Sequence, residues 1–296
     1  MKALVFGSLN IDKVYSLAHL PEKGETLRCK DYELHVGGKG LNQAIALKKA
    51  GFDVAMAGAV GTDGAFLKAH LDENGVDTSL LLTTNGYTGH AIIEVDPDGQ
   101  NQMVLFAGAN IAITPAYCDK VLEDFGKGDL LLMQYETSCV EYMTKKARKK
   151  GLTVALNPSP YVKELNDFPY ENVDILILNE SEGISITGEN DIQKAVSALL
   201  ERTNGGKVVL TLGGDGAVFA AGKEYVQVPA FRVNAVDTTG AGDTFTGYFL
   251  NAYLQGAQPK EALTRASAAS SIAVTKKGAA ETIPTQEETE AFLASV

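Results

Sequence analysis

The stretch "DTTGAGDTF", Asp237 to Phe245, places two carboxylates, hydroxyl side chains and two glycines directly before the apolar run "GYFLNAYL". The glycines precede a helix pattern, so the backbone N–H groups of Gly240, Ala241 and Gly242 are expected at a helix N-terminus. Unpaired donors and the helix dipole attract anions there, and phosphate is the natural guest. Asp243 is then either a cap for first-turn amides or a base that takes a proton from an alcohol attacking a phosphoryl group. These residues alone leave both interpretations open.

A second glycine-rich element is "GGKGLNQA", Gly37 to Ala44, which also leads into an apolar helix pattern. The paired glycines, Gly37 and Gly38, allow a ligand to approach the backbone closely. Lys39 and Asn42 supply polar donors for hydroxyl groups. The alternative interpretation is a simple turn between a strand and a helix.

Three further polar residues follow apolar runs that have the character of strands. Asn10 and Asp12 come after "ALVFG", and Glu136 comes after "LLLMQY". Ligands of open α/β sheets bind at the carboxyl ends of the strands. Such a set of amides, carboxylates and one lysine suits a polyol better than an anion, although each residue taken singly is also compatible with an ordinary loop.

Several well-known motifs do not occur in the chain. It contains no GxGxxG, no Gly-Lys pair followed by Ser or Thr, no HExxH and no GxSxG. The three cysteines are far apart, without a CxxC pair, which argues against a disulfide framework or a zinc site. A nucleotide that binds here is therefore expected to bind without a dinucleotide fingerprint or a Walker A loop.

Composition and charge restrict the partners of the chain. Acidic residues outnumber basic ones 37 to 26, a formal net charge of −11, which disfavours nucleic acid and anionic lipid as partners. The basic run "KKARKK", Lys145 to Lys150, is followed by Gly151, a pattern typical of a helix end. No apolar run approaches the roughly 20 residues of a membrane helix, and the first residues do not resemble a signal peptide. We expect a cytoplasmic protein that does not bind membranes.

Alternating apolar runs and helix patterns predict the fold class. The runs "ALVFG", "VAMAGAVG", "DLLLMQ", "TVALNP", "DILILN" and "KVVLTLG" are apolar throughout, as in strands that are buried on both faces of a parallel sheet. Helix spacing with terminal glycines occurs between them, in 39–51, 64–75, 115–126 and 191–205. This alternation predicts a doubly wound, mainly parallel α/β sheet.

Two segments do not follow this alternation of apolar strands and helices. Residues 13–36 and 87–107 alternate apolar with polar side chains, and "DPDG" in the second is a hairpin signal. We expect them to form a small β-sheet that covers one edge as a lid or forms a dimer contact. The α/β core then consists of residues 1–12, 37–86 and 108–296.

Taken together, these motifs resemble the ribokinase-like carbohydrate kinases over nearly the whole chain. The resemblance rests on "GSLNID", "GGKGLNQA", "AGAN", "LMQYE", "LNPSP", "LNESE", "TLGGDG", "VDTTGAGDTF" and "AVTKKGA", in this order. It implies that Asp243 is the base and that Gly240, Ala241 and Gly242 form an anion hole. It further implies a sugar site, formed by Asn10, Asp12, Gly38, Lys39, Gly40, Asn42, Glu136 and Asp243.

The resemblance also implies ATP, Mg²⁺ and K⁺ as cofactors, and a homodimer formed through the lid. The residues matching the ATP positions are Asn179, Thr211, Gly213, Gly214, Gly216, Gly242 and Ser267. Glu182 would hold Mg²⁺ through water. The residues matching the monovalent-cation site are Asp237, Thr239, Ala273, Lys276, Gly278 and Thr282, several of them through backbone carbonyls.

The activity that this resemblance implies is ATP-dependent phosphorylation of a sugar's primary hydroxyl, with D-ribose as the expected acceptor and D-ribose 5-phosphate as the product. Other acceptors remain as alternatives: deoxyribose, fructose, a keto-deoxy sugar acid or a nucleoside. A third interpretation is a sugar sensor without catalysis. The intact Asp243 and its glycines argue against a sensor, because a protein that only binds sugar has no need of a base.

Overall fold

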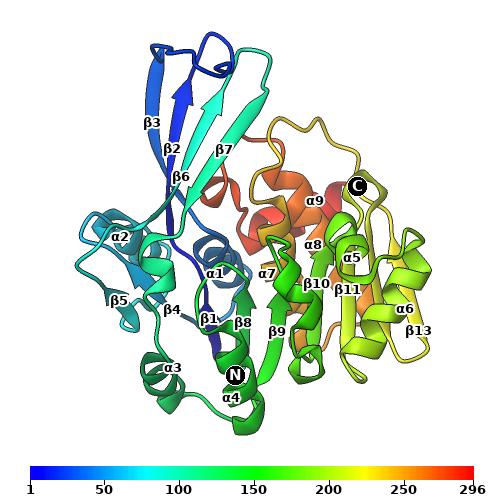
Figure 1. The fold of residues 1–296 in the computed structure, drawn as a ribbon. Coiled ribbons are helices and arrows are strands. Elements are labelled where there is room, and N and C mark those ends of the chain that lie inside the picture. Colours follow the sequence, from blue (N-terminus) through cyan, green and yellow to red (C-terminus); the bar gives the residue numbers. More distant parts are fainter.

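A nine-stranded sheet forms the centre of the computed structural model, which describes residues 1–296 (Figure 1). The strand order is β13-β12-β11-β10-β9-β8-β1-β4-β5, and only β12 and β13 run antiparallel to their neighbours. The bounds are β1 Ala3–Phe6, β4 Val54–Val60, β5 Leu81–Thr83, β8 Leu130–Gln134, β9 Thr153–Asn157, β10 Ile175–Asn179, β11 Lys207–Thr211, β12 Ala217–Ala221 and β13 Glu224–Val228.

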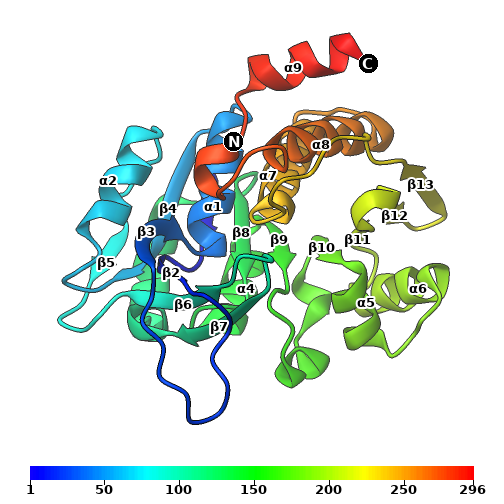
Figure 2. The same ribbon diagram turned by 90° about the horizontal axis from the view of Figure 1, so that it is seen from above.

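Helices cover both faces of this sheet, as the view from above shows (Figure 2). Helices α1 Lys39–Lys49, α2 Ala65–Glu73, α7 Ala241–Leu254 and α8 Pro259–Ala273 lie on one face, and α9 Gln286–Ser295 packs on α8. Helices α3 Pro115–Val121, α4 Val140–Lys150, α5 Glu180–Thr187 and α6 Ile192–Arg202 lie on the other. No helix combines the length and the apolar character needed to cross a membrane.

The apolar strand residues divide between two cores, one on each face. In β1, Ala3 and Val5 belong to one cluster of 38 buried residues, whereas Leu4 and Phe6 belong to a second cluster of 31. Successive side chains of a strand point to opposite faces, so a strand with a core on both sides must be apolar throughout. This confirms the predicted doubly wound, mainly parallel sheet.

The elements agree closely with the sequence prediction. All six predicted sheet strands form, and the helices predicted in 39–51, 64–75 and 191–205 appear as α1, α2 and α6. Helix α3 is shorter than predicted, because the chain tightens into a 3-10 turn at Leu122–Asp124. The basic run ends α4, and Gly151 adopts the left-handed conformation just past it, with a φ of 82°. The antiparallel strands β12 and β13 were not predicted.

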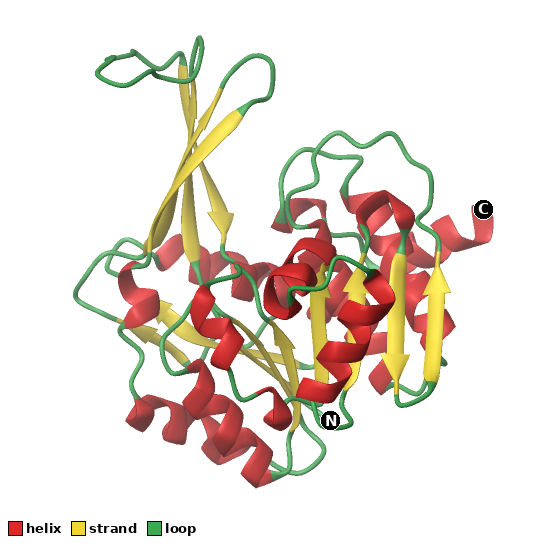
Figure 3. Ribbon diagram, turned by 45° about the vertical axis from the view of Figure 1, so that its right-hand side comes forward, coloured by secondary structure: helices red, strands yellow, loops and turns green.

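The small sheet stands clear of the main body (Figure 3). It contains β2 Asn10–Ser16, β3 Asp31–Gly37, β6 Gly89–Val95 and β7 Asn101–Phe106, in the order β3-β2-β6-β7. Strands β2 and β6 pair in parallel, and the two outer strands pair antiparallel to them. The "DPDG" turn joins β6 to β7, with the amide of Asp96 bonded to the carbonyl of Gln100. The sheet begins at Asn10, so Asn10 and Asp12 lie at its base, next to the carboxyl edge of the main sheet.

Candidate functional site

The start of α7 presents free backbone donors. Gly240 precedes the helix with a φ of 73°, a left-handed conformation that glycine adopts without strain. The N–H groups of Gly240 and Gly242 have no hydrogen-bond partner in the protein, whereas that of Ala241 donates to the carbonyl of Thr238 at 3.2 Å. Two amides of the expected anion hole are thus available to an anion, and the third is engaged in the turn.

Asp243 lies in the first turn of α7 and is 7% exposed. Its carboxylate accepts from side chains of α1 rather than from the amides of its own helix turn. Asn42 Nδ2 donates to Oδ2 at 3.0 Å, and Gln43 Nε2 donates to Oδ1 at 2.8 Å. The helix-cap interpretation therefore has no hydrogen bond to support it, and the carboxylate is held as an acceptor between two helices.

Residues that the sequence analysis did not select complete the surroundings of Asp243. Gln43, which follows Asn42 in the second glycine motif, also donates to Asn157 Oδ1 at 2.9 Å and accepts from Gln134 Nε2 at 2.6 Å. Gln134 and Asn157 end the neighbouring strands β8 and β9. The only signal in the sequence was an uncharged polar residue at the end of an apolar strand, which is common and unspecific.

The expected sugar-binding residues on α1 and after β8 lie together. Ser8 donates its hydroxyl to Glu136 Oε2 and accepts from the amide of Gly40 at 3.4 Å. The amide of Lys39 also points to Glu136 Oε2, at 3.4 Å. Ser8 is fully buried and was not predicted. It ties the end of β1 to the start of α1 and to Glu136. Gly38 is the residue that precedes α1.

Asn10 and Asp12 enter the same region from β2. Asn10 Oδ1 accepts from Asn110 Nδ2 at 2.8 Å, and Asn110 Oδ1 accepts from the amide of Leu9 at 3.1 Å. Burial, and after it the charge of Glu136, raise the pKa of Asp12 to about 6, against the opposing charge of His35. A hydroxyl donor from a ligand would relieve part of this unfavourable burial.

Lys39 balances the acidic groups of the site. Burial alone would lower the pKa of its ammonium group, but the charges of Asp243, Glu136 and Glu182 outweigh burial and raise that pKa. Burial likewise raises the pKa of Glu136, against the Ser8 hydrogen bond and the Lys39 charge. A single half-buried cation thus interacts with three carboxylates that come from distant parts of the chain.

A pocket beside the anion-binding amides gathers most of the expected nucleotide positions. It is lined by Thr211, Gly213, Gly216, Ala230, Ala241, Gly242, Phe245, Ser267, Ser270 and Ser271. Gly214 and Asn179 do not line it. Ser267, Ser270 and Ser271 share one face of α8, and Ser270 donates to the carbonyl of Ala241 at 3.0 Å. The pocket is thereby joined to the first turn of α7.

Asn179 and Glu182 form a capping box at the start of α5. Asn179 Oδ1 accepts from the amide of Glu182 at 2.8 Å, and Glu182 Oε2 accepts from the amide of Asn179 at 3.0 Å. One carboxylate oxygen of Glu182 is therefore used locally. The other has no protein partner, although Glu182 is 7% exposed.

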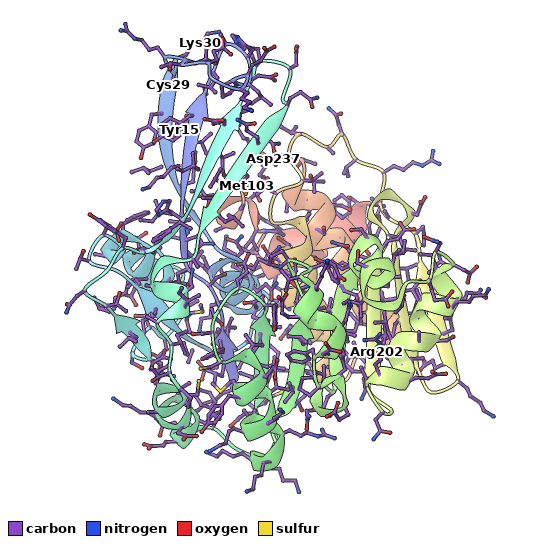
Figure 4. The ribbon with its side chains drawn as sticks, in the orientation of Figure 1. Tyr15, Cys29, Lys30, Met103, Arg202 and Asp237 are labelled. Carbon is purple, nitrogen blue, oxygen red and sulfur yellow. The ribbon has the colours of Figure 1, made fainter.

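The residues expected to hold a monovalent cation meet where two loops come together. Asp237 Oδ1 accepts from the amide and the hydroxyl of Thr239 at 2.9 and 2.7 Å, and Oδ2 accepts from the amide of Gly278 at 3.0 Å. Partial burial raises the pKa of Asp237, but these hydrogen bonds outweigh burial and lower it. Asp237 is labelled in Figure 4, in the loop before α7.

The second loop runs from the end of α8. The carbonyl of Ala273 accepts from the amide of Lys276 at 3.2 Å, and the hydroxyl of Thr282 donates to the carbonyl of Ala279 at 2.8 Å. A Cβ on Gly240 would lie 3.1 Å from Cα of Ala279, so this loop packs against the anion-binding turn.

Comparisons with known proteins find relatives over nearly the whole chain. The family model "pfkB family carbohydrate kinase" matches residues 1–286. A ribokinase of Haemophilus influenzae is 39% identical, with 98% of this chain and 97% of the relative covered. A crystal structure of ribokinase from Thermotoga maritima superposes with a TM-score of 0.90 at 32% identity, covering 99% of both chains. A structure of Arabidopsis thaliana ribokinase complexed with ribose and ATP has a TM-score of 0.87 at 30% identity, covering 99% of this chain and 98% of that one.

Proposed function

Because this chain belongs to the pfkB family of carbohydrate kinases, we propose that it transfers the γ-phosphoryl group of ATP to the primary hydroxyl of D-ribose, giving D-ribose 5-phosphate. The structure of the Arabidopsis relative was solved with ribose and ATP, and its fold matches along the whole chain. The observation that carries the proposal is Asp243, a buried carboxylate that lies beside free amides and close to Lys39 and Glu136.

Each part of the site has a task in this reaction. Asn10, Asp12, Lys39, Asn42 and Glu136 would bind the sugar hydroxyls and orient one of them toward Asp243. Asp243 takes the proton of that hydroxyl as the hydroxyl oxygen forms a bond to the γ-phosphorus, and the bond between the γ-phosphorus and the bridging oxygen of ADP breaks. The amides of Gly240 and Gly242 stabilise the charge on the transferring phosphoryl group.

The nucleotide pocket would take ATP from the opposite side of the same helix turn. Thr211, Gly213, Gly216 and Ser267 line it, and Gly242 belongs both to the pocket and to the anion-binding amides. The free carboxylate oxygen of Glu182 suits a hydrated Mg²⁺, which when bound would neutralise charge on the phosphates. Gly214 and Asn179 would contribute only at the margin of the nucleotide.

The proposal is tested by the release of ADP with ribose and Mg·ATP. Asp243→Asn keeps the shape of the side chain and removes the base, so kcat should fall by about 10²- to 10⁴-fold. Asp53→Asn, at the amino end of β4 and remote from the site, should keep the turnover of the unaltered protein. Equal turnover in Asp243→Asn would disprove the mechanism. If deoxyribose or fructose exceeds ribose in kcat/KM, the acceptor is wrong while the mechanism stands.

We further propose that a monovalent cation, K⁺ foremost, binds between the Asp237 loop and the 273–282 loop. One charged carboxylate with a ring of carbonyls suits a weakly hydrated ion, and these loops pack against Gly240. Replacing K⁺ by tetramethylammonium should lower kcat several-fold, and Asp237→Ala should make kcat insensitive to this exchange. Full activity without K⁺ would contradict this proposal.

The small sheet is proposed to act both as a lid over the sugar and as the contact of a homodimer. Asp12 lies on one of its faces, which we call the inner face. Lys277 Nζ of the core approaches Glu33 Oε2 on this face at 3.9 Å. The other face, called the outer face, carries Tyr15, Tyr32, Leu34, Val104 and Phe106, which the strand pairing places together.

A further inference from the structure

Two glutamine side chains beside the proposed base are completely buried. Gln43 lies in α1 and Gln134 at the end of β8, and both are 0% exposed. A buried amide is costly unless its donors and acceptor find partners, so fully buried glutamines signal a specific hydrogen-bond arrangement. Neither has been given a role in binding or catalysis above.

A backbone carbonyl determines which atom of the Asn157 side-chain amide faces Gln43. Asn157 Nδ2 donates to the carbonyl of Ile177 at 2.9 Å, across the pair of strands β9 and β10. A carbonyl oxygen can only accept, so the amide nitrogen of Asn157 must face Ile177 and its Oδ1 must face the other way, toward Gln43. The orientation of Asn157 thereby follows from the sheet itself.

Gln43 is then oriented from two sides. Its Nε2 donates one proton to Asn157 Oδ1 at 2.9 Å and the other to Asp243 Oδ1 at 2.8 Å. Its Oε1 accepts from Gln134 Nε2 at 2.6 Å. If the Gln43 amide were reversed, its oxygen would face the oxygens of Asn157 and Asp243, and its nitrogen would face the Gln134 nitrogen, which is a donor. Gln43 can therefore present only a donor to Asp243.

The other oxygen of Asp243 is held independently by Asn42 Nδ2 at 3.0 Å. Two successive residues of α1 thus bind one carboxylate oxygen each, which prevents rotation of the carboxyl group and leaves its remaining lone pairs for a substrate. The charged groups close enough to interact with this carboxylate are Lys39 and Glu136, and Glu182 in turn interacts with Lys39.

We propose that Gln43 is a positioning residue for the proposed kinase reaction: held by Gln134 and Asn157, it orients Asp243 and favours its charged form. This inference rests on the proposed function for its catalytic consequence. Its structural part, the dependence of the Asp243 carboxyl group on the Gln43 amide, can be measured without turnover.

The first test compares Gln43→Leu with a matched control. Leucine fills most of the volume and removes the donor, so kcat for ribose should fall about 10- to 100-fold, the equivalent of one hydrogen bond to a charged group. KM should change less than threefold. The acid limb of kcat against pH, which reports protonation of the base, should move up by about one pH unit.

Asn251→Leu is the control, because Asn251 Nδ2 donates to the carbonyl of Ala50 at 2.6 Å and so joins the same two helices away from Asp243. It should lower the melting temperature while leaving the acid limb in place. If Gln43→Leu leaves the acid limb unmoved, or if Asn251→Leu moves it equally, Gln43 has no specific effect on the base and the inference is wrong.

A second test uses no substrate and includes Gln43→Glu, which keeps the shape of glutamine if the leucine variant fails to fold. In protein labelled with ¹³C at the aspartate carboxyl carbons, the Asp243 signal is identified by its loss in Asp243→Asn. Its titration midpoint should rise in Gln43→Leu and rise further in Gln43→Glu, where a second carboxylate replaces the donor. An unchanged midpoint overturns the inference. Absence of ribose phosphorylation by the unaltered protein, with the midpoint shifting as expected, overturns the proposed function only.

Discussion

At the scale of single residues, burial of the Asp12 carboxylate in the proposed sugar site lowers the stability of the ligand-free protein at neutral and higher pH. Its pKa is raised from 3.8 to about 6, with burial as the largest cause. Between these values the folded protein binds more protons than the unfolded chain, so stability falls as the pH rises through this window. Asp12→Asn should therefore stabilise the ligand-free protein at pH 8, by about 1–3 kcal/mol, but not at pH 4.

Thermal or urea unfolding at the two pH values measures this difference. Asp98→Asn removes a charge from the exposed turn between β6 and β7 and serves as the control, with little effect expected at either pH. An equal gain in stability at pH 4 and pH 8 for Asp12→Asn would show that burial of its charge is not the cause.

Asp12→Asn should also weaken ribose binding at pH 8. Both oxygens of a carboxylate accept hydrogen bonds from hydroxyl groups, whereas the asparagine side chain has a single acceptor oxygen.

At the scale of elements, the close crossing of α1 and α7 brings the donors of one helix to the carboxylate of the other. Gly247 is where they meet: a Cβ there would lie 2.5 Å from Cβ of Ala46 and 2.7 Å from its backbone carbon. Gly247→Ala would ordinarily stabilise a helix by about 0.5–1 kcal/mol. Here it should instead destabilise the protein by about 1–3 kcal/mol, because the helices must separate.

Separation of the helices should also lower kcat, since Asn42 and Gln43 would withdraw from Asp243. Unfolding curves and ribose kinetics check the two effects together. Ser197→Ala on the exposed face of α6 controls for helix propensity and should be neutral or slightly stabilising. A Gly247→Ala protein that is both more stable and fully active would refute the importance of this crossing.

At the scale of the whole molecule, the upright small sheet exposes apolar side chains that a monomer would leave in water. Val104 and Phe106 of the outer face are 65% and 49% exposed, and Leu34 is 52% exposed. Tyr15 and Met103 mark this sheet, above the main body, in Figure 4. An exposed apolar patch on a two-faced sheet is typical of an interaction surface. We predict that the outer face forms the dimer contact.

Val104→Glu should convert the dimer to a monomer in sedimentation velocity experiments, because a carboxylate would be buried without a partner. Met103→Glu is the matched control: it lies on the adjacent position of β7 but on the inner face, and the dimer should persist. An unaltered protein that sediments as a monomer, or a Val104→Glu protein that remains a dimer, would contradict the prediction.

The amino-acid sequence by itself determined the alternation of strands and helices and the two glycine motifs, because apolar periodicity and helix starts are local properties. The expectation of backbone donors at a helix start, with Asp243 in the same helix turn, follows from nine consecutive residues. The bounds of the helices were less predictable: α3 ends early, since its last turn tightens against the core.

Only the tertiary structure decided what holds Asp243. Gln43 is 200 residues away from it along the chain, and Gln134 is 91 residues away from Gln43. A buried glutamine has no local pattern, since its partners come from other strands and helices. The tertiary structure also decided that the amide of Ala241 donates to the carbonyl of Thr238 and that one carboxylate oxygen of Glu182 accepts from the amide of Asn179. It further decided which face of the small sheet points away from the site. Each depends on long-range packing, which brings together groups that short-range spacing cannot relate.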